Sequence, residues 1–154
     1  MPTEFTQSLK DQIAKTLKPV LAETFQLYVA TLNVHWNVTG PLFQPVHALT
    51  EEQYLEIAPA IDEIAERVRA LGHKAPATMQ QYMALGSIAD GEENAAAEVM
   101  VQALQQGHEQ LANRIRPLIT QAADAGDDVT AGLLTNRLTV HEKAQWMLGA
   151  MLGA

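Results

Sequence analysis

Apolar residues recur every three or four positions along nearly the whole chain, and this spacing constrains the fold more than any other feature of the sequence. In the N-terminal part the recurring residues are Leu9, Ile13, Leu17, Leu21, Phe25, Tyr28, Leu32 and Trp36. The spacing is that of an α-helix, in which residues three and four apart share one face. It predicts one helix over residues 3–38, ended by the Gly40-Pro41 dipeptide.

The same period resumes after Pro45 and predicts a second helix that runs to about Leu71. Its apolar stripe consists of Ile57, Ile61, Ile64, Val68 and Leu71. Gly72 follows the stripe and is expected to end the helix. Residues 73–89 contain a proline and a glycine around a short apolar piece, so we expect a connecting loop with one short helix.

Two further helices are predicted in the C-terminal half. Asp90 followed by Glu93 has the spacing of a capping box and predicts the start of a third helix, which Gly126 ends. Asp127 or Asp128 is placed to cap a fourth helix that runs nearly to the last residue. Four helices, one long connection and no strand pattern predict a single four-helix-bundle domain comprising all 154 residues.

The composition excludes several classes of protein. There is no cysteine, which excludes a disulfide framework and a thiolate metal site. No stretch approaches the roughly 18 consecutive apolar residues of a membrane span. The opening MPTEFTQSLK lacks the apolar block of a secretory signal, so we expect a cytoplasmic protein with no membrane partner.

The net charge of −8 argues against nucleic-acid binding, because an acidic surface repels phosphate backbones. Lys10, Lys15 and Lys18 come closest to a basic patch, but acidic residues are interleaved with them. We interpret these lysines as a solvated helix face. Direct DNA binding is therefore not expected.

Five side chains form a candidate metal site: His35, His47, Glu51, Asp62 and Glu66. Imidazoles and carboxylates without thiolates suit iron, zinc or manganese. The last four lie on the predicted second helix, where they fall within about 100° of one another at about 100° per residue. The isoleucine stripe points to the other side of His47, so this polar stripe must face something other than the chain's own core.

The axial spacing indicates what the polar stripe faces. Glu51 and Asp62 are separated by about 16 Å along a helix, whereas metal–ligand bonds are about 2 Å long, so one chain cannot bring both to one metal site. If the helix pairs antiparallel with a copy of itself, opposed residues have numbers with a constant sum. The pairs His47–Glu66 and Glu51–Asp62 share that sum. The pairing predicts two equivalent metal sites in a two-fold dimer, with His35 as a further ligand from the first helix.

Other interpretations remain open on the residues alone. The histidines could be ordinary core residues, the carboxylates could be solvated charges, and Glu66 could pair with Arg67 or Arg69. Trp36 is better explained by packing than by redox chemistry. The chain would then be a helical interaction module. A di-iron site inside one bundle would need Glu-x-x-His pairs, and no glutamate here is followed by histidine three residues later.

The segments HWNVTGPLFQPVHALTEEQY and DEIAERVRALG resemble the Dps family of mini-ferritins, also called DNA-binding proteins from starved cells. The segment HEKAQWML in the predicted fourth helix is similar to that family as well. The resemblance covers almost the whole chain from Leu9 onward. It rests on a histidine, a second histidine twelve residues later, a carboxylate four later, an aspartate eleven later and a glutamate four after that.

The resemblance implies a ferritin-like four-helix bundle, with a short helix in the long connection between helices two and three, assembled into a hollow homododecamer. It implies ferroxidase centres at the two-fold interfaces, where His35, His47 and Glu51 come from one chain and Asp62 and Glu66 from its partner. Glu66 would bridge the two metals. The implied activity is oxidation of Fe(II), commonly by hydrogen peroxide, with storage of ferric mineral and protection against oxidative damage. Zinc and manganese are the competing metals.

Three departures from the family pattern bear on function. Several relatives carry aspartate where this chain has Glu51, which alters the geometry of one iron position but not its charge. Relatives that bind DNA often use a lysine-rich tail, whereas this chain ends in MLGAMLGA, so protection of DNA by direct binding is not expected. A nucleoid-associated DNA-binding protein with little ferroxidase activity is the alternative hypothesis. Asp127 and Asp128 either line a pore for iron uptake or cap the fourth helix, and Gly132 stands where many relatives have another aspartate.

Overall fold

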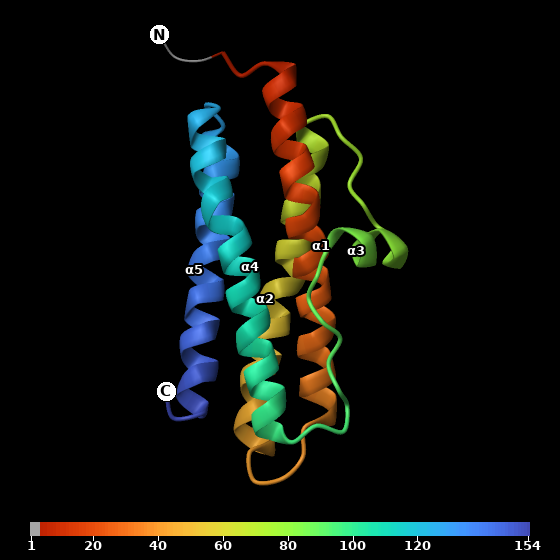
Figure 1. The fold of residues 1–154 in the computed structure, drawn as a ribbon, viewed down its shortest axis with the longest axis vertical. Helices are drawn as coiled ribbons and strands as arrows, with labels where there is room; N and C mark the ends of the chain where they lie inside the picture. Colours follow the sequence, from red (N-terminus) through yellow and green to blue (C-terminus); the bar gives the residue numbers. More distant parts are fainter. Residues whose placement is uncertain (1–3) are drawn as a thin grey trace.

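The computed structural model describes residues 4–154, and this range contains α-helices and no strand. The helices are α1 (Gln7–Asn37), α2 (Phe43–Ala70), α3 (Met79–Leu85), α4 (Ala97–Asp124) and α5 (Asp128–Met151). The four long helices form a bundle, and the short α3 lies beside it (Figure 1). This arrangement confirms the predicted four-helix bundle with a short helix in its long connection.

The path of the chain makes α2 and α4 parallel. In the view of Figure 1 the chain runs down α1 and up α2, then returns along the outside of the bundle through α3 before running up α4 and down α5. Helices α1 and α2 pack together extensively as one antiparallel pair, and α4 and α5 as another. A single long crossover of this kind occurs in ferritin-like bundles.

The core is aliphatic, and the predicted stripe of α2 lies within it. Ile57, Ile64 and Val68 are buried against the other long helices. Fully burying a side chain of this size stabilises the fold by about 1.5–3 kcal/mol. No helix among residues 4–154 is long and apolar enough to cross a membrane.

A buried carboxylate fastens the long connection to the bundle. The side chain of Glu23 on α1 is fully buried and accepts hydrogen bonds at 3.0 Å from both the backbone N–H and the hydroxyl of Ser87. Arg114 of α4 pairs with the same carboxylate, through Nε at 2.6 Å and Nη2 at 3.3 Å. Glu23 therefore joins α1, the connection and α4 in one network.

Both glycines that were predicted to end helices do so. Gly72 and Gly126 have φ of +93° and +81°, which side chains with a Cβ rarely adopt. In each case the N–H that follows the glycine bonds to the carbonyl five residues earlier. This is the Schellman arrangement, in which the glycine lets the last carbonyls of a helix find donors.

Two predicted helix starts were displaced. The predicted start of the first helix at Thr3 lies outside the described residues, and residues 4–6 precede α1, whose N-cap is Thr6. Helix α2 begins at Phe43, before Pro45 rather than after it. A proline is tolerated there because the first turn of a helix has no carbonyl partners for its N–H groups.

The capping box predicted at Asp90 and Glu93 was wrong, because α4 begins only at Ala97. The segment around these residues carries no apolar stripe, so a helix there would have nothing to bury. The capping box of this chain lies instead at the start of α3, where Thr78 and Gln81 exchange side-chain and backbone hydrogen bonds.

Candidate metal centre

Two of the five predicted ligands meet within one protomer. His35 lies near the end of α1 and is only 5% exposed, and His47 lies in the second turn of α2. The short turn between the helices folds them together so that the two imidazoles stack, with ring centroids 3.8 Å apart and planes 11° apart. Phe43 also stacks on His47, at a centroid distance of 5.0 Å.

Each of these histidines is held by the backbone of the other. His35 Nδ1 lies 2.8 Å from the carbonyl oxygen of His47, and His47 Nδ1 lies 2.7 Å from the carbonyl oxygen of His35. A carbonyl oxygen can only accept, so both Nδ1 atoms must carry the proton. In the neutral ring the lone pair is then on Nε2. A carbonyl oxygen bonded to Nδ1–H in this way prepares an imidazole to bind a metal ion.

Further contacts restrict rotation of the His35 ring. Thr50 Oγ1 lies 3.2 Å from His35 Nδ1 and itself donates to the carbonyl of Val46 at 2.7 Å. The ring of Tyr54 meets His35 edge-on, with centroids 5.0 Å apart. The direction in which Nε2 of His35 points is therefore fixed by the protein itself.

The three carboxylates lie on the exposed side of α2. Glu51 follows His47 by one turn, whereas Asp62 and Glu66 lie near the other end of the same continuous helix. Among residues 4–154, one protomer gathers no three His, Asp, Glu or Cys side chains around a common point. The histidines and the distant pair of acids therefore do not form one site within a single protomer.

Glu66 is not engaged by the arginines that could have neutralised it. Arg67 pairs with Asp127 at 2.7 Å, and Arg69 donates to the carbonyl of His73 at 3.0 Å. Neither arginine forms an ion pair with Glu66 within the described range. The interpretation of Glu66 as half of an intrahelical ion pair is therefore not supported.

Two large apolar side chains are exposed near the candidate ligands, one on α1 and one on α2. Leu55 lies within the acidic stripe, about 80° around the helix from His47, and is 60% exposed. Trp36, which follows His35, is 69% exposed and so is not packed in the core of the protomer. Clusters of exposed apolar side chains of this kind mark interaction surfaces.

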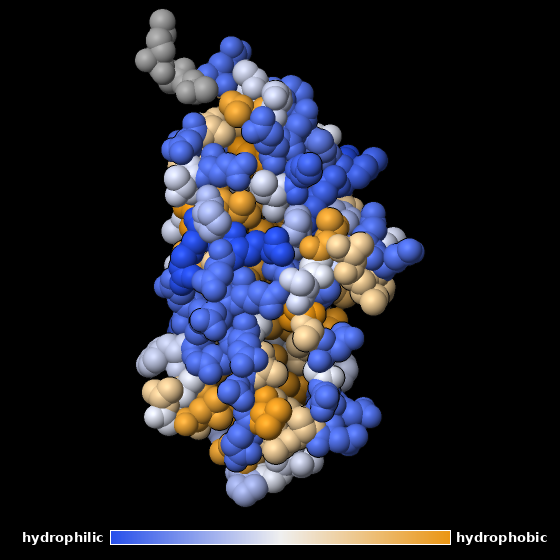
Figure 2. Space-filling model, viewed as in Figure 1, coloured by the Kyte–Doolittle hydropathy of each residue, from blue (hydrophilic) through white to orange (hydrophobic). Residues whose placement is uncertain are grey.

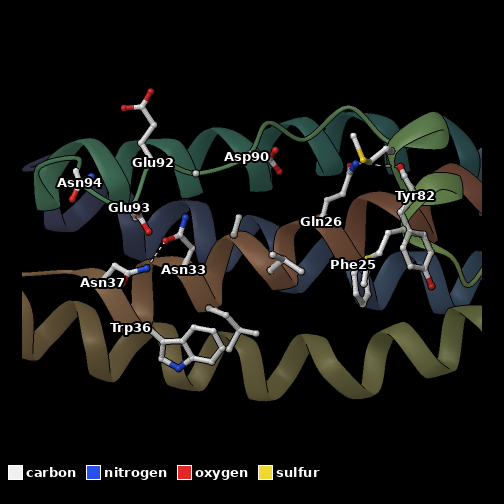
Figure 3. Close-up of a pocket in the computed structure, with 16 residues that line it drawn as sticks. Phe25, Gln26, Asn33, Trp36, Asn37, Tyr82, Asp90, Glu92, Glu93 and Asn94 are labelled. Carbon is white, nitrogen blue, oxygen red and sulfur yellow. Dashed lines mark hydrogen bonds between the residues drawn. The ribbon is translucent and has the colours of Figure 1, made fainter.

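Trp36 also lines an open groove of about 870 Å³ between α1, α3 and the segment before α4 (Figure 3). Tyr82 of α3 and the acids Asp90, Glu92 and Glu93 stand around the same groove. Figure 2 shows hydrophobic side chains gathered over α3 on this face. The protomer therefore presents a hollow, partly apolar surface next to the helix end that carries His35.

Comparison with known proteins identifies the family of the chain. The model of the ferritin-like domain matches residues 14–154. DNA protection during starvation protein 2 from Bacillus anthracis is 36% identical over 144 residues, which cover 94% of this chain and 99% of that protein. The chain belongs to the Dps family of ferritin-like proteins.

Other known proteins are similar over comparable lengths. Antigen TpF1 from Treponema pallidum is 40% identical over 143 residues, which cover 92% of this chain and 81% of that protein. The crystal structure of the Vibrio cholerae Dps protein superimposes with a TM-score of 0.91 at 28% identity, covering 99% of this chain and 98% of that one. That protein is described as a member of a broad superfamily of ferritin-like diiron-carboxylate proteins.

The two aspartates at the start of α5 lie in different surroundings in this Dps chain. Asp127 is 2% exposed, pairs with Arg67 and accepts from the backbone N–H of Thr130 at 3.0 Å. It is thus the N-cap of α5, as one of the two interpretations predicted, and its carboxylate is not free to line a pore. Asp128 is exposed.

The sequence did not single out a second polar cluster inside this Dps bundle. His108 of α4 and His141 of α5 are buried with their Nδ1 atoms 2.9 Å apart. The signal was available, because His108 occupies an apolar-stripe position between Leu104 and Leu111. A polar residue at such a position requires a buried partner.

Proposed function

We propose that the protein oxidises Fe(II) at metal sites shared between two copies of the chain and stores the ferric product in a hollow homo-oligomer, in the manner of a dodecameric mini-ferritin. Membership of the family supports iron binding and storage in general. The description of the Vibrio cholerae relative as a diiron-carboxylate protein supports iron as the metal. We place this activity in the cytoplasm, as the sequence led us to expect.

The observation that carries the proposal is the reciprocal bonding of His35 and His47. Two Nδ1–H···O=C bonds, at 2.8 and 2.7 Å, leave both Nε2 atoms as lone-pair donors. Loss of a hydrogen bond that orients a metal-binding histidine typically lowers metal affinity or activity by about 10–100-fold.

The acids reach these histidines through a second copy of the chain. When α2 pairs antiparallel with its copy, the register that opposes His47 to the partner's Glu66 also opposes Glu51 to the partner's Asp62. Each site then holds two imidazoles and three carboxylates. Glu66 would bridge two iron ions through its two oxygens, with His35, His47 and Asp62 as terminal ligands. Carboxylates bind Fe(III) more strongly than Fe(II), which favours the oxidised product.

Two adjacent iron ions suit a two-electron oxidant. Each Fe(II) gives up one electron, and hydrogen peroxide accepts both as its O–O bond breaks, so that two Fe(II), one peroxide and two protons yield two Fe(III) and two water molecules. Paired transfer avoids release of the hydroxyl radical that one-electron reduction of peroxide produces. This chemistry would protect the cell from both Fe(II) and peroxide. Zinc and manganese bind the same kinds of ligand and would compete.

The second copy is also the occupant that we propose for the apolar surface. Leu55 lies in the middle of the stripe that the α2 pairing would cover, and Trp36 adjoins His35. Covering these side chains would remove apolar area from water at about 25 cal/mol per Å². The same partner, a second copy of the chain, would thus cover Leu55 and Trp36 and complete the set of metal ligands.

Protection of DNA through direct binding is the weaker hypothesis. The relative from Bacillus anthracis is named for DNA protection, but the net charge of −8 in this chain disfavours contact with phosphates. We propose that any protection of DNA by this chain acts through removal of iron and peroxide.

Anomalous diffraction at the iron absorption edge tests the proposal on crystals of the oligomer soaked in Fe(II). We expect iron next to His35 and His47 of one chain and next to Asp62 and Glu66 of its partner. Iron bound only elsewhere, or a dimer in which these groups lie far apart, would exclude the shared site.

A further inference from the structure

Three threonines within α1 and α2 are fully buried and share one local geometry. They are Thr24 and Thr31 on α1 and Thr50 on α2. The hydroxyl of each donates to the backbone carbonyl four residues earlier, at 2.7 Å. Such a bond satisfies the buried hydroxyl but slightly destabilises the helix. Helix stability therefore does not explain why threonine occupies these positions.

Thr50 differs from the other two because its hydroxyl also contacts a candidate metal ligand on the neighbouring helix. Thr50 Oγ1 lies 3.2 Å from Nδ1 of His35. The one hydroxyl proton is taken by backbone carbonyls of α2, at 2.7 Å for Val46 and 3.2 Å for His47. Nδ1 of His35 carries the ring proton, because it donates to the carbonyl of His47 at 2.8 Å. The hydroxyl oxygen must therefore accept from the same Nδ1–H.

The second acceptor determines how the His35 ring is tilted. The torsion that turns a histidine ring has broad energy minima, so contacts must set its orientation. The carbonyl of His47 fixes the place of Nδ1 but allows the ring to pivot about that bond. The Thr50 hydroxyl lies in a second direction from the same Nδ1–H, and the edge-on ring of Tyr54 limits movement from one side. Together these contacts define where Nε2 points.

The same contact changes the electron density of the ring. The bond from His35 to Thr50 continues into the bond from Thr50 to the carbonyl of Val46. Hydrogen bonds in such a chain polarise one another. An acceptor at Nδ1–H makes the opposite nitrogen of an imidazole a stronger donor to a metal ion. The hydroxyl thus affects both the direction and the strength of Nε2 as a ligand.

We propose that Thr50 is a positioning residue of the metal site, whose hydroxyl holds the His35 ring in its metal-binding orientation. This inference rests on the proposed function, in which His35 is a ligand. Thr50 itself does not touch the metal ion, so its loss should weaken binding without removing a ligand. Loss of an orienting bond lowers metal affinity by about 10–100-fold. Since the carbonyl of His47 stays in place, we expect a loss of about tenfold.

Three variants separate this role from packing. Thr50→Val keeps the shape of the side chain and removes the hydroxyl. Thr31→Val is the matched control, because it removes the same back bond from a fully buried threonine one helical turn before His35. Thr50→Ser restores the hydroxyl and removes only the methyl group. A purely structural role of the hydroxyl predicts equal behaviour of T50V and T31V.

Calorimetric titration of the metal-free oligomer with Zn(II), which has no redox chemistry, is the test. The binding sites that are lost in His35→Ala identify those that depend on His35. At these sites we expect T50V to bind Zn(II) about tenfold more weakly than the parent, and T50S and T31V to bind it as the parent does. Equal affinities of T50V and T31V, or a T50S protein as weak as T50V, would overturn the role of the hydroxyl.

The His35→Ala variant also distinguishes this inference from the proposed function. If it binds Zn(II) as fully as the parent, the proposed site and the role of Thr50 both fail. If it loses sites while T50V binds like the parent, only the role of Thr50 fails. In the iron assay, the Fe(II) concentration that gives half the maximal rate should rise in T50V, with little change in the rate at saturating Fe(II). A lower saturated rate at an unchanged half-saturation would contradict a positioning role.

Discussion

His35 and His47 donate to each other's backbone carbonyl oxygens across the α1–α2 turn, at 2.8 and 2.7 Å. Because both acceptors are main-chain atoms, the ring positions follow from the path of the backbone rather than from neighbouring side chains. The two imidazoles are thus arranged by the fold itself. The acids that would complete the site depend instead on a second chain.

Removal of the distant acids should abolish rapid iron oxidation. In the double variant D62A/E66A we expect the initial rate of Fe(II) oxidation with peroxide to fall by more than about tenfold, since both partner ligands are lost. The rate can be followed by ultraviolet absorption of the ferric product, and circular dichroism should be unchanged. Glu63→Ala, an exposed acid on the same helix, is the control. A double variant as fast as the parent would exclude these ligands.

Two inactive variants should restore activity when they are mixed. His47→Ala removes a ligand from the histidine half of the site, and D62A/E66A removes the acid half. In a mixed dimer one site contains both defects and the other contains none. If the two chains are unfolded together and refolded, random pairing should recover about a quarter of the parental rate. No recovery, in refolded material of normal size, would place all ligands in one chain.

Leu55 should be required for pairing but not for folding. Leu55→Asp places a charge at the centre of the proposed α2–α2 contact, beside other acids, and should convert the oligomer to smaller species without loss of helix. Light scattering after size exclusion gives the mass, and the iron assay should show loss of the fast phase. Thr120→Asp, an exposed site on α4, serves as the control. An L55D protein of unchanged mass would argue against this face as the interface.

Glu23 should contribute far more to stability than an exposed ion pair does. Glu23→Ala leaves Arg114 and the Ser87 donors without their acceptor, and breaking a buried pair costs about 3–5 kcal/mol. Glu142→Ala removes the exposed pair with Arg116 and should cost less than about 1 kcal/mol. Denaturant unfolding compares the two. Equal losses of unfolding free energy in the two variants would mean that the contacts of Glu23 do not stabilise the bundle more than an exposed ion pair does.

Mild acid should weaken the fold through the buried histidines. Burial, reinforced by Arg137, lowers the pKa of His108 to about 3, and burial also places the pKa of His141 well below its ordinary value. In the unfolded chain both histidines titrate near the ordinary pKa of 6.5. Below that pH the unfolded state therefore binds more protons than the folded state does. Above it, the two histidines cause no loss of stability. As the pH falls below 6.5, each histidine costs up to about 1.4 kcal/mol of stability per pH unit, and for His108 this continues towards pH 3.

Unfolding midpoints in urea at several pH values between 7.5 and 5 would measure this slope. Asp11, whose pKa is lowered chiefly by its hydrogen bond with His73, affects stability only near and below its ordinary pKa of 3.8, outside that interval. H108Q should show a shallower slope than the parent. A midpoint independent of pH across the interval would mean that the pair is accessible to protons in the native state.

Much of the fold could be predicted from periodicity, because the buried stripe of α2 depends only on residues a turn apart. The helix ends at Gly72 and Gly126 could also be predicted, since few other residues tolerate positive φ. The positions at which helices start could not be predicted in this way. The Asp90–Glu93 pair has the right spacing for a cap, but capping contributes only about 1 kcal/mol, and burial of the apolar face that starts at Ala97 decides where α4 begins.

The candidate site was predictable in part. The register of His47 and Glu66 on α2 follows from helix geometry alone. The reciprocal bonds of His35 and His47 do not, because they depend on how a short turn places two backbones. The pairing of His108 with His141 was equally hidden, since the residues lie 33 positions apart on different helices.

The position of Glu23 in the chain also affects synthesis. Its carboxylate leaves the ribosome with α1, but its arginine partner lies 91 residues further on. Until α4 emerges, the α1–α2 hairpin holds an uncompensated charge on the face it must bury, and water has to remain there. Completion of the inner packing is therefore deferred to late elongation, and a truncated product lacking α4 would stay hydrated along that face.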